Sequence, residues 1–462
     1  MILNRFATTL LLTLFMTSSL PALDDPKTSR PPNVQAAFDA MEARDAASSN
    51  SAEHVGQIGG KIPVMKAISM FRERVAKRTE DFRSMTVLGQ LYIRLAKETG
   101  NHSAYRSAEK TLREALGIAP DYLTAKSSLA VALGAQHRFR EAFKLASEVY
   151  VANPIDTKAL ATIGDCQIQL GQIAAAETTY AALLEKAGKT PAVLSRLAQL
   201  AELKGNPQAA VELLQSARDM AHEAGQSPHA VAWYDMRLAA VYHMAGDADE
   251  ARVHYQSALE LDSALQPARV GLGRLLADHG DIELALDLLE ESVNANGSAT
   301  AMIALADVLS HQGRPDTARV WYDRAEEVLL QEMQSAGTAH QRDLAMLYCK
   351  RGHKLDEAVA MAKQDLQSRT DIYAHDTLAW ALHNSGRHTE AAAVIRKALQ
   401  LGTKDPQLHY HAGLICDAND QPQQAITHLR QALQWNPHFG LLEAEKARAK
   451  LTELEATADA KL

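Results

Sequence analysis

Residues able to do acid–base chemistry gather in the last third of the sequence, in HDTLAWALHNSGRHTEA at positions 375–391. His375 stands directly beside Asp376, and two more histidines follow. An imidazole paired with a carboxylate can act as a general base in hydrolysis, and imidazoles also bind metal ions. Adjacent residues on a helix point about 100° apart, however, which is not the geometry of a catalytic pair. A hydrolase with a site grafted onto the fold is therefore kept only as an alternative.

Two glycine-rich segments offer no specific nucleotide site. GQIGGKI at 56–62 has Val55 where a phosphate-binding loop needs its first Gly, and its Lys is followed by Ile62 instead of Ser or Thr. GLGRLL at 271–276 has no strand before it, as a dinucleotide site would require. We expect no cofactor.

Histidines and cysteines show no metal-binding spacing either. Nine of the eighteen histidines lie between His340 and His438, yet none forms a zinc motif. The three cysteines, Cys166, Cys349 and Cys416, are far apart, odd in number, and more typical of small side chains packed between helices than of disulfides. We expect no specific metal site, and we keep a His-rich ligand- or metal-responsive binding protein as the alternative function.

Composition favours a helical chain with a solvated acidic surface. Hydrophobic residues make up 47% of the 462 residues and aromatic residues only 5%, so the apolar content is mostly Ala and Leu, which favours helix over strand. The formal net charge is -8, from 48 basic and 56 acidic residues without long blocks of one sign. Nucleic acid and anionic lipid require a basic surface, so neither is expected as a partner.

The N-terminal residues have the layout of an export signal. MILNRFATTLLLTLFMTSSLPALDDP contains one Arg, an apolar run from Phe6 to Phe15, and then small residues. This predicts a secretory signal peptide over residues 1–22 and a mature chain in the periplasm or outside the cell. An uncleaved anchor is the alternative, and no later segment reaches the roughly 20 apolar residues of a membrane span. Residues 23–63, rich in Pro, Ser and Gly, predict a largely disordered linker.

From residue 64 onward the sequence repeats itself. Alanines recur at steps of 33 or 34 residues, broken by two steps of about 40, and a second small residue stands about twelve positions before each. The marker alanines are Ala108, Ala142, Ala176, Ala210, Ala251, Ala285, Ala318, Ala358, Ala391 and Ala425. A Gly recurs between the two markers in most units. A fixed period with several markers predicts about ten stacked units over residues 64–438.

Each unit is predicted to be a pair of antiparallel helices. Small residues on both helices let the backbones approach closely, and the Gly ends the first helix in a left-handed conformation. A larger side chain four residues after the marker Ala lies on the same helical face and can pack into the next unit. Residues 439–462 alternate in charge and predict a C-terminal capping helix and tail.

These positions resemble the tetratricopeptide repeat. RLAAVYHMAGDADEARVHYQSALELD carries its signature positions at Leu238, Ala239, Tyr242, Gly246, Ala251, Tyr255 and Ala258. The segments HDTLAWAL, LGTKDPQLHYHAG and ALQWNPHF also look like those of a group of exported bacterial proteins with many such repeats. The resemblance implies an all-α solenoid, a right-handed superhelix of about ten helix-turn-helix units. The first unit departs from the pattern by an insertion, AKETGNHSAY, and two junctions are longer than the rest.

The resemblance also implies that the first helix of each unit lines a concave groove where a protein segment binds. In the last two units the side chains expected on that face are Tyr373, Asp376, Trp380, His383, Asn384, Tyr410 and Asp417. Aromatic residues beside hydrogen-bonding groups are typical of binding hot spots, and packing of Trp380 in the core is the competing interpretation. No unit has the Lys and Asn of the family's chaperone-tail clamp, so a C-terminal carboxylate is not expected as the ligand.

We therefore predict a non-enzymatic interaction scaffold of the bacterial cell envelope that binds a protein or peptide segment in its concave groove. Repeats occupy the chain from about residue 82 to its end. What remains after the signal peptide is too short and too polar for an independent enzyme core.

Overall fold

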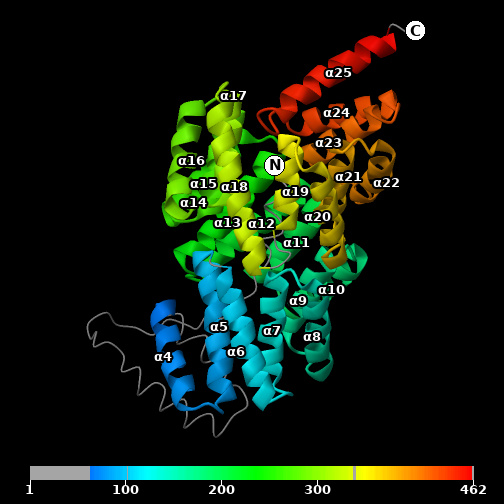
Figure 1. Ribbon diagram of the computed structural model, residues 1–462. Coiled ribbons are helices and arrows are strands. Elements are labelled where there is room, and N and C mark those ends of the chain that lie inside the picture. The colour runs from blue at the N-terminus through cyan, green and yellow to red at the C-terminus, as the bar shows by residue number, and fades with distance from the viewer. Residues whose placement is uncertain (1–62, 101, 337–339, 460–462) are drawn as a thin grey trace. The chain divides into compact units, whose positions relative to one another are not determined.

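The computed structural model describes residues 63–459 apart from 101 and 337–339. The predicted signal peptide and the predicted linker up to residue 62 lie outside the described residues. All regular secondary structure in the described part is helical, with 22 helices, α4 to α25, and no strand (Figure 1). The prediction of an all-α chain is confirmed.

The helices alternate between a first helix, here called the inner helix, and a second, outer helix in each of ten units. The inner helices are α5 (Phe82–Thr99), α7 (Leu123–Ala135), α9 (Thr157–Gln169), α11 (Pro191–Leu203), α13 (Pro228–Met244), α15 (Gln266–Asp278), α17 (Ala299–His311), α19 (Gln341–Arg351), α21 (Ile372–Asn384) and α23 (Pro406–Asp417). The outer helices are α6 (Ser103–Ile118), α8 (Phe139–Ala152), α10 (Ile173–Ala187), α12 (Pro207–Glu223), α14 (Ala248–Leu261), α16 (Ile282–Asn296), α18 (Pro315–Ala336), α20 (Leu355–Ser368), α22 (His388–Ala398) and α24 (Pro422–Trp435). Helix α4 (Val64–Lys77) precedes the first unit, and α25 (Glu443–Asp459) follows the last.

The chain divides into two compact units of structure, an N-terminal unit and a C-terminal unit. The N-terminal unit contains the described residues up to Gln136 together with Glu141–Thr162, and the C-terminal unit contains His137–Arg140 and the residues from Ile163 on. In the N-terminal unit, α4 buries Phe71 and neighbouring apolar residues against α5. In most of the helix pairs, the outer helix packs against its own inner helix and against the inner helix of the next pair, as stacked repeats require. The right-handed sense of the superhelix stays a prediction.

The recurring Gly ends the inner helices as predicted. Positive φ angles, between 65° and 89°, occur at Gly171, Gly205, Gly246, Gly280, Gly313, Gly352 and Gly386. His137 and Asp420 adopt the same left-handed conformation, with φ of 61° and 57°, at the corresponding turns of units that lack the Gly. Glycine enters this region without the steric penalty of a Cβ atom, which explains why it recurs at the turns.

The small residues on the inner helices make room for large side chains of the outer helices. A Cβ atom at Gly164 would lie 2.3 Å from the ring of Tyr180, which is four residues after the marker Ala of the same unit. Tyr255 packs instead into the next unit, where a Cβ atom at Gly271 would lie 2.4 Å from its ring. The larger residue thus packs against a small one in its own unit or in the following one.

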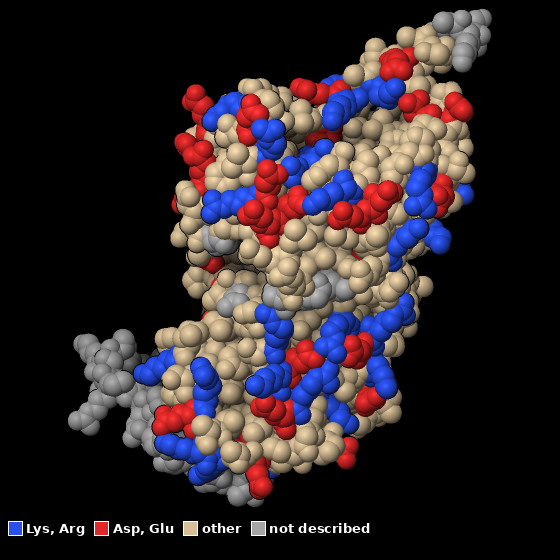
Figure 2. Space-filling model, viewed as in Figure 1, with Lys and Arg blue, Asp and Glu red and all other residues tan. Residues whose placement is uncertain are grey.

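Helix α25 covers apolar side chains of the last unit. Ala444, Ala447 and Leu454 of this helix form one buried cluster with residues of α23 and α24, among them Tyr410 and Leu429. On the face seen in Figure 2, basic and acidic side chains are interspersed. Of the helices described, none combines the length and the hydropathy that a membrane crossing needs.

Candidate protein-binding face

The inner helices of the C-terminal unit are buried on nearly all sides. In α13, 14 of the 17 residues are buried, whereas in the outer helix α14 only Ala251, Tyr255 and Ala258 are buried. An inner helix that packed only against its neighbours in a stack would leave one face to solvent. Another part of the chain must therefore cover the inner helices.

Acidic side chains on the inner helices or at their caps pair with an Arg, Lys or His side chain of the neighbouring unit. The pairs are Asp165 with Arg196, Glu202 with Arg237, His243 with Asp278, Asp307 with Lys350, Arg342 with Asp371, and Asp376 with His411, at 2.6 to 3.2 Å. Within the described residues, such a pair occurs between all consecutive inner helices from α9 to α23 except α15 and α17. There, Arg274 donates to the carbonyl of Thr300 at 3.3 Å. We call this series the inner polar seam. Buried charges persist only when they are paired, and here the pairing is within the chain.

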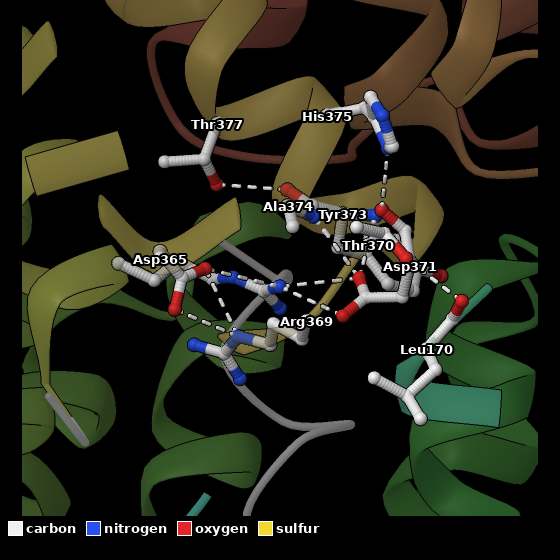
Figure 3. Close-up of polar contacts among 10 residues, drawn as sticks. Leu170, Asp365, Arg369, Thr370, Asp371, Tyr373, Ala374, His375 and Thr377 are labelled. Carbon is white, nitrogen blue, oxygen red and sulfur yellow. Dashed lines mark hydrogen bonds and ion pairs between the residues drawn. The ribbon is translucent and has the colours of Figure 1, made fainter. Parts of the chain in front are cut away.

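The inner polar seam is densest just before α21 (Figure 3). Asp371 caps α21 by accepting hydrogen bonds from the backbone of Tyr373 at 2.8 Å and of the next residue at 3.0 Å, and Arg342 donates to it at 3.1 Å. Asp365 and Arg369, at the end of α20, form a second buried pair at 2.9 Å. Burial opposes the charge on Asp371, but the two arginines outweigh it and lower the pKa of this carboxyl. Two cations and two anions thus neutralise one another out of contact with water.

Asp376 pairs with His411 of the next inner helix and not with the adjacent His375. Both side chains of the pair are completely buried, with Oδ1 of Asp376 2.9 Å from Nδ1 of His411. The amide of Gln407 lies 2.9 Å from the other ring nitrogen, and His375 bonds to the Asp371 carbonyl at 3.0 Å. Because both side chains of the pair are completely buried and both ring nitrogens of His411 already have partners, the geometry favours a structural role over general-base hydrolysis.

The seven residues predicted to line the concave groove fall into two groups. Three are at most 4% exposed, namely Tyr373, Asp376 and Tyr410. Four are partly exposed, namely Trp380, His383, Asn384 and Asp417. The first group contacts the chain itself in this structure, and only the second reaches solvent. That a partner binds them stays a prediction.

Trp380 lies between these two groups. Its ring stacks on the buried His411 at a centroid distance of 4.0 Å and on the partly exposed His383 at 5.2 Å. Asn384 donates to the Trp380 carbonyl at 2.8 Å, and Asp417 forms an ion pair with Lys450 of α25 at 3.3 Å. The Trp380 ring therefore has one neighbour in the core, His411, and one near the surface, His383. The first contact agrees with packing in the core, and the second agrees with a place on the groove.

Part of the surface that covers the inner helices comes from the same chain about six units further on. Three side chains in the loops before α21, before α23 and after α24 donate to carbonyls at the ends of α9, α11 and α13. These contacts are Thr370 Oγ1 to Leu170 at 2.7 Å, Thr403 Oγ1 to Leu203, and Asn436 Nδ2 to His243 at 2.7 Å. The last carbonyls of a helix have no partner within it, so each donor acts as a cap from a distant unit. We call these three the closure contacts.

The turn glycines beside the closure contacts allow a backbone approach that a side chain would block. A Cβ atom added to Gly171 would lie 2.5 Å from the carbonyl oxygen of Thr370. One added to Gly205 would lie 2.3 Å from the carbonyl oxygen of Gly402, and one added to Gly246 would lie 2.6 Å from that of Trp435. At the equivalent turns of other units, Gly280, Gly313, Gly352 and Gly386, it would meet nothing within 4 Å. The close approach is therefore specific to the three units that make closure contacts.

A narrow cleft lies where the first closure contact meets the inner polar seam. It is lined by residues of α9, α11, α19 and α21, including Gln169, Gln199, Arg342 and Tyr373. The side-chain oxygens of Gln169 and Gln199 and the Nε atom of Arg342 are buried without a hydrogen-bond partner. Each buried polar atom left unpaired costs about 1–3 kcal/mol. The packing between the two ends of the C-terminal unit is therefore polar and incompletely satisfied at this point.

Histidines of the last two units approach one another in pairs. The Nδ1 atoms of His409 and His428 lie 3.1 Å apart, and the rings of His383 and His388 are 5.0 Å apart. Burial first, and the neighbouring imidazoles next, lower the pKa of His383 and of His409 to about 4. Within the described ranges, no three His, Cys, Asp or Glu side chains are grouped so as to hold a metal ion.

Comparison with known proteins identifies the repeats. Four family models, each described as tetratricopeptide repeat, match residues 189–264, residues 133–200 and 242–298, residues 299–324 and 372–397, and residues 406–439. Together these segments cover more than half of the chain. Among solved structures, the TPR domain of P58(IPK) is similar, with 13% sequence identity, 92% of this chain and 99% of that chain covered, and a TM-score of 0.30. No curated protein matches the chain.

Proposed function

The chain belongs to the tetratricopeptide repeat family, and on that basis we propose that it is a non-enzymatic scaffold of the bacterial cell envelope that binds a segment of a partner protein. Tetratricopeptide repeats indicate a protein–protein interaction scaffold, because stacked helical units offer extended surfaces to other chains. The apolar run followed by small residues at the N-terminus supports export.

The partner segment binds where the inner face reaches solvent, at Trp380, His383, Asn384 and Asp417. These four residues carry the proposal, because the inner polar seam and the closure contacts leave them partly exposed. A ring that already stacks on its neighbours loses little conformational freedom when a partner covers it. The partner that fits is a segment with an apolar anchor for the Trp380 ring and with polar groups for Asn384 and Asp417.

Photo-crosslinking in the native bacterium tests this site. A photoreactive amino acid replaces His383, and a control chain carries it at Val320, which is 61% exposed on the outer helix α18. We expect a discrete crosslinked protein from position 383 and none of the same mass from position 320. Cell fractionation of bacteria that produce these two chains tests the assignment to the envelope, because both chains should be recovered in the envelope fraction.

Matched variants show whether Trp380 contributes to binding. Trp380→Ala and Asn384→Ala should each reduce the crosslink from position 383 by about tenfold or more, as expected for hot-spot residues. Trp321→Ala, which removes a partly exposed Trp from an outer helix, should leave it unchanged. Asn384→Ala guards against misfolding of the Trp380 variant. A crosslink that survives both inner-face changes would overturn the proposed site.

A further inference from the structure

We propose that the three closure contacts form a latch that opens as one unit and uncovers the inner face of the C-terminal unit. The contacts join the ends of α9, α11 and α13 to the loops around α21, α23 and α24, at sequence separations of 193 to 200 residues. The latch itself is inferred from these contacts alone, and its role in admitting a partner rests on the function proposed above.

Hydrogen bonds join the two sides of the latch, and apolar side chains such as Leu203, Ile372 and Leu401 line the cleft beside the first of them. Besides the three side-chain caps, the backbone amide of Thr370 donates to the carbonyl of Gln169 at 2.9 Å. The cleft beside it contains buried polar atoms of Gln169, Gln199 and Arg342 that have no partner. The stacked neighbours within the array, in contrast, share one large apolar cluster that runs from α11 to α23. Because hydrogen bonds exchange readily with water, the closure contacts are the part of this interface that can release while the stacking remains.

The loops that carry the three donors are tied together, so they should move together. Asp376 and His411 join α21 to α23 through a completely buried pair, and α25 packs on α23 and α24. In the other half of the contact, Arg196 and Asp165 join α9 to α11 at 2.7 Å. A small change of curvature in each intervening unit is enough to separate the two ends, because each unit in a repeat array contacts mainly its neighbours.

Opening uncovers residues that the inner face was predicted to present. Tyr373 lines the cleft opposite Gln169 and Gln199 and is 4% exposed. It is buried at the boundary between the two ends of the C-terminal unit, and not only by its own helix pair. Release of the latch would expose this ring and extend the partly exposed surface around Trp380.

Hydrogen exchange at the Thr370 amide tests the latch without any partner. This amide bonds across the closure, so its exchange with deuterated water, resolved by mass spectrometry with fragmentation, reports opening. Asn436→Ala removes the contact at the far end, two units away, together with the hydrogen bond that Oδ1 of Asn436 accepts from the backbone amide of His438 at 2.7 Å. In Asn419→Ala, the control, the lost Asn side chain donates to the carbonyls of His388 and Ile415 at 2.9 and 2.8 Å, within neighbouring units.

A latch that opens as one unit makes the distant change visible at Thr370. Asn436→Ala and Thr403→Val should each raise the exchange rate of the Thr370 amide about tenfold, the effect of losing one buried hydrogen bond. Asn419→Ala should leave that rate within about twofold. Unchanged exchange at Thr370 in both closure variants would overturn the proposal, because the contacts would then open independently. An equal rise in the Asn419 control would also overturn it, since general destabilisation would explain the effect. Neither result depends on the crosslinking outcome.

Discussion

The closure contacts predict that two glycines with the same backbone conformation respond differently to an added methyl group. Gly205 and Gly313 both follow the end of an inner helix, with φ of 73° and 71°. A Cβ atom would lie 2.3 Å from the Gly402 carbonyl oxygen at Gly205 and would meet nothing within 4 Å at Gly313. Alanine in the left-handed region costs about 1–2 kcal/mol at either position. The difference between Gly205→Ala and Gly313→Ala therefore isolates the closure contact.

The size of that difference follows from what must move. At Gly205 the opposite loop has to withdraw, which costs roughly 1–3 kcal/mol as overpacking. The hydrogen bond from Thr403 to Leu203 weakens with it, at about 1 kcal/mol. We expect Gly205→Ala to lower the free energy of unfolding by roughly 2–4 kcal/mol more than Gly313→Ala. Urea denaturation followed by circular dichroism measures both variants. Equal losses would refute the closure, because the helix end and the distant loop would then not touch.

Two further predictions concern buried polar groups. Asp165→Asn leaves the guanidinium of Arg196 buried without a counter-charge and should lower the free energy of unfolding, measured by urea denaturation, by about 3–5 kcal/mol. Glu177→Gln, in an exposed pair, should lower it by less than about 1 kcal/mol. Similar losses in the two variants would contradict a stabilising role of the inner polar seam. His409 is neutral in the folded chain because its pKa is lowered to about 4, so the stability that it contributes is fully present above its ordinary pKa of 6.5 and is lost as the pH falls from there toward 4. The loss of stability should reach about 3 kcal/mol in the unchanged protein and should be smaller in His409→Gln. Thermal unfolding as a function of pH measures both. The same pH profile for the unchanged protein and the variant would show that the His409 imidazole, which lies beside His428, does not contribute to the pH dependence.

The features of the fold that could be predicted from the sequence act between neighbours in the chain. The turn Gly of most units is required by the left-handed backbone at the end of its own helix. The small residue Gly164 is required by the ring of Tyr180, sixteen positions later in the sequence. Such requirements recur with every unit, so they appear as a period of 33 or 34 residues. The all-α architecture, the helix pairs and the left-handed turns all follow from that period.

The inner polar seam could have been found by comparing consecutive units. Asp165 and Arg196 both lie near the small marker of their inner helix, and Asp376 and His411 do the same two hundred residues later. An acidic side chain in one unit and an Arg or His at such a position in the next predict a pair between neighbours. This signal does not distinguish the two possibilities, because a concave face that binds another protein requires the same residue types as one whose helices bind each other.

The closure contacts leave no comparable signal. Whether Thr370 reaches Leu170 depends on the rotation between successive units, summed over six of them. A few degrees more or less in each unit would move the loop past the helix end. Thr403 and Asn436 are also ordinary residues for the loops in which they stand, so neither their type nor their spacing distinguishes them from a surface residue. Only the positions of the units in space reveal these contacts.

The inner polar seam bears on why a chain of similar units adopts one stacking order. Apolar contacts between such units are nearly interchangeable, since each unit offers the same small and large residues at the same places. The charged pairs are not interchangeable, because the acid comes from the earlier unit in Asp165–Arg196 and from the later unit in Arg342–Asp371. A unit stacked on the wrong neighbour would bury an unpaired charge, at a cost of several kcal/mol. We therefore infer that these buried pairs select the register of the array, which explains why the inner face is polar although most of it is closed to solvent.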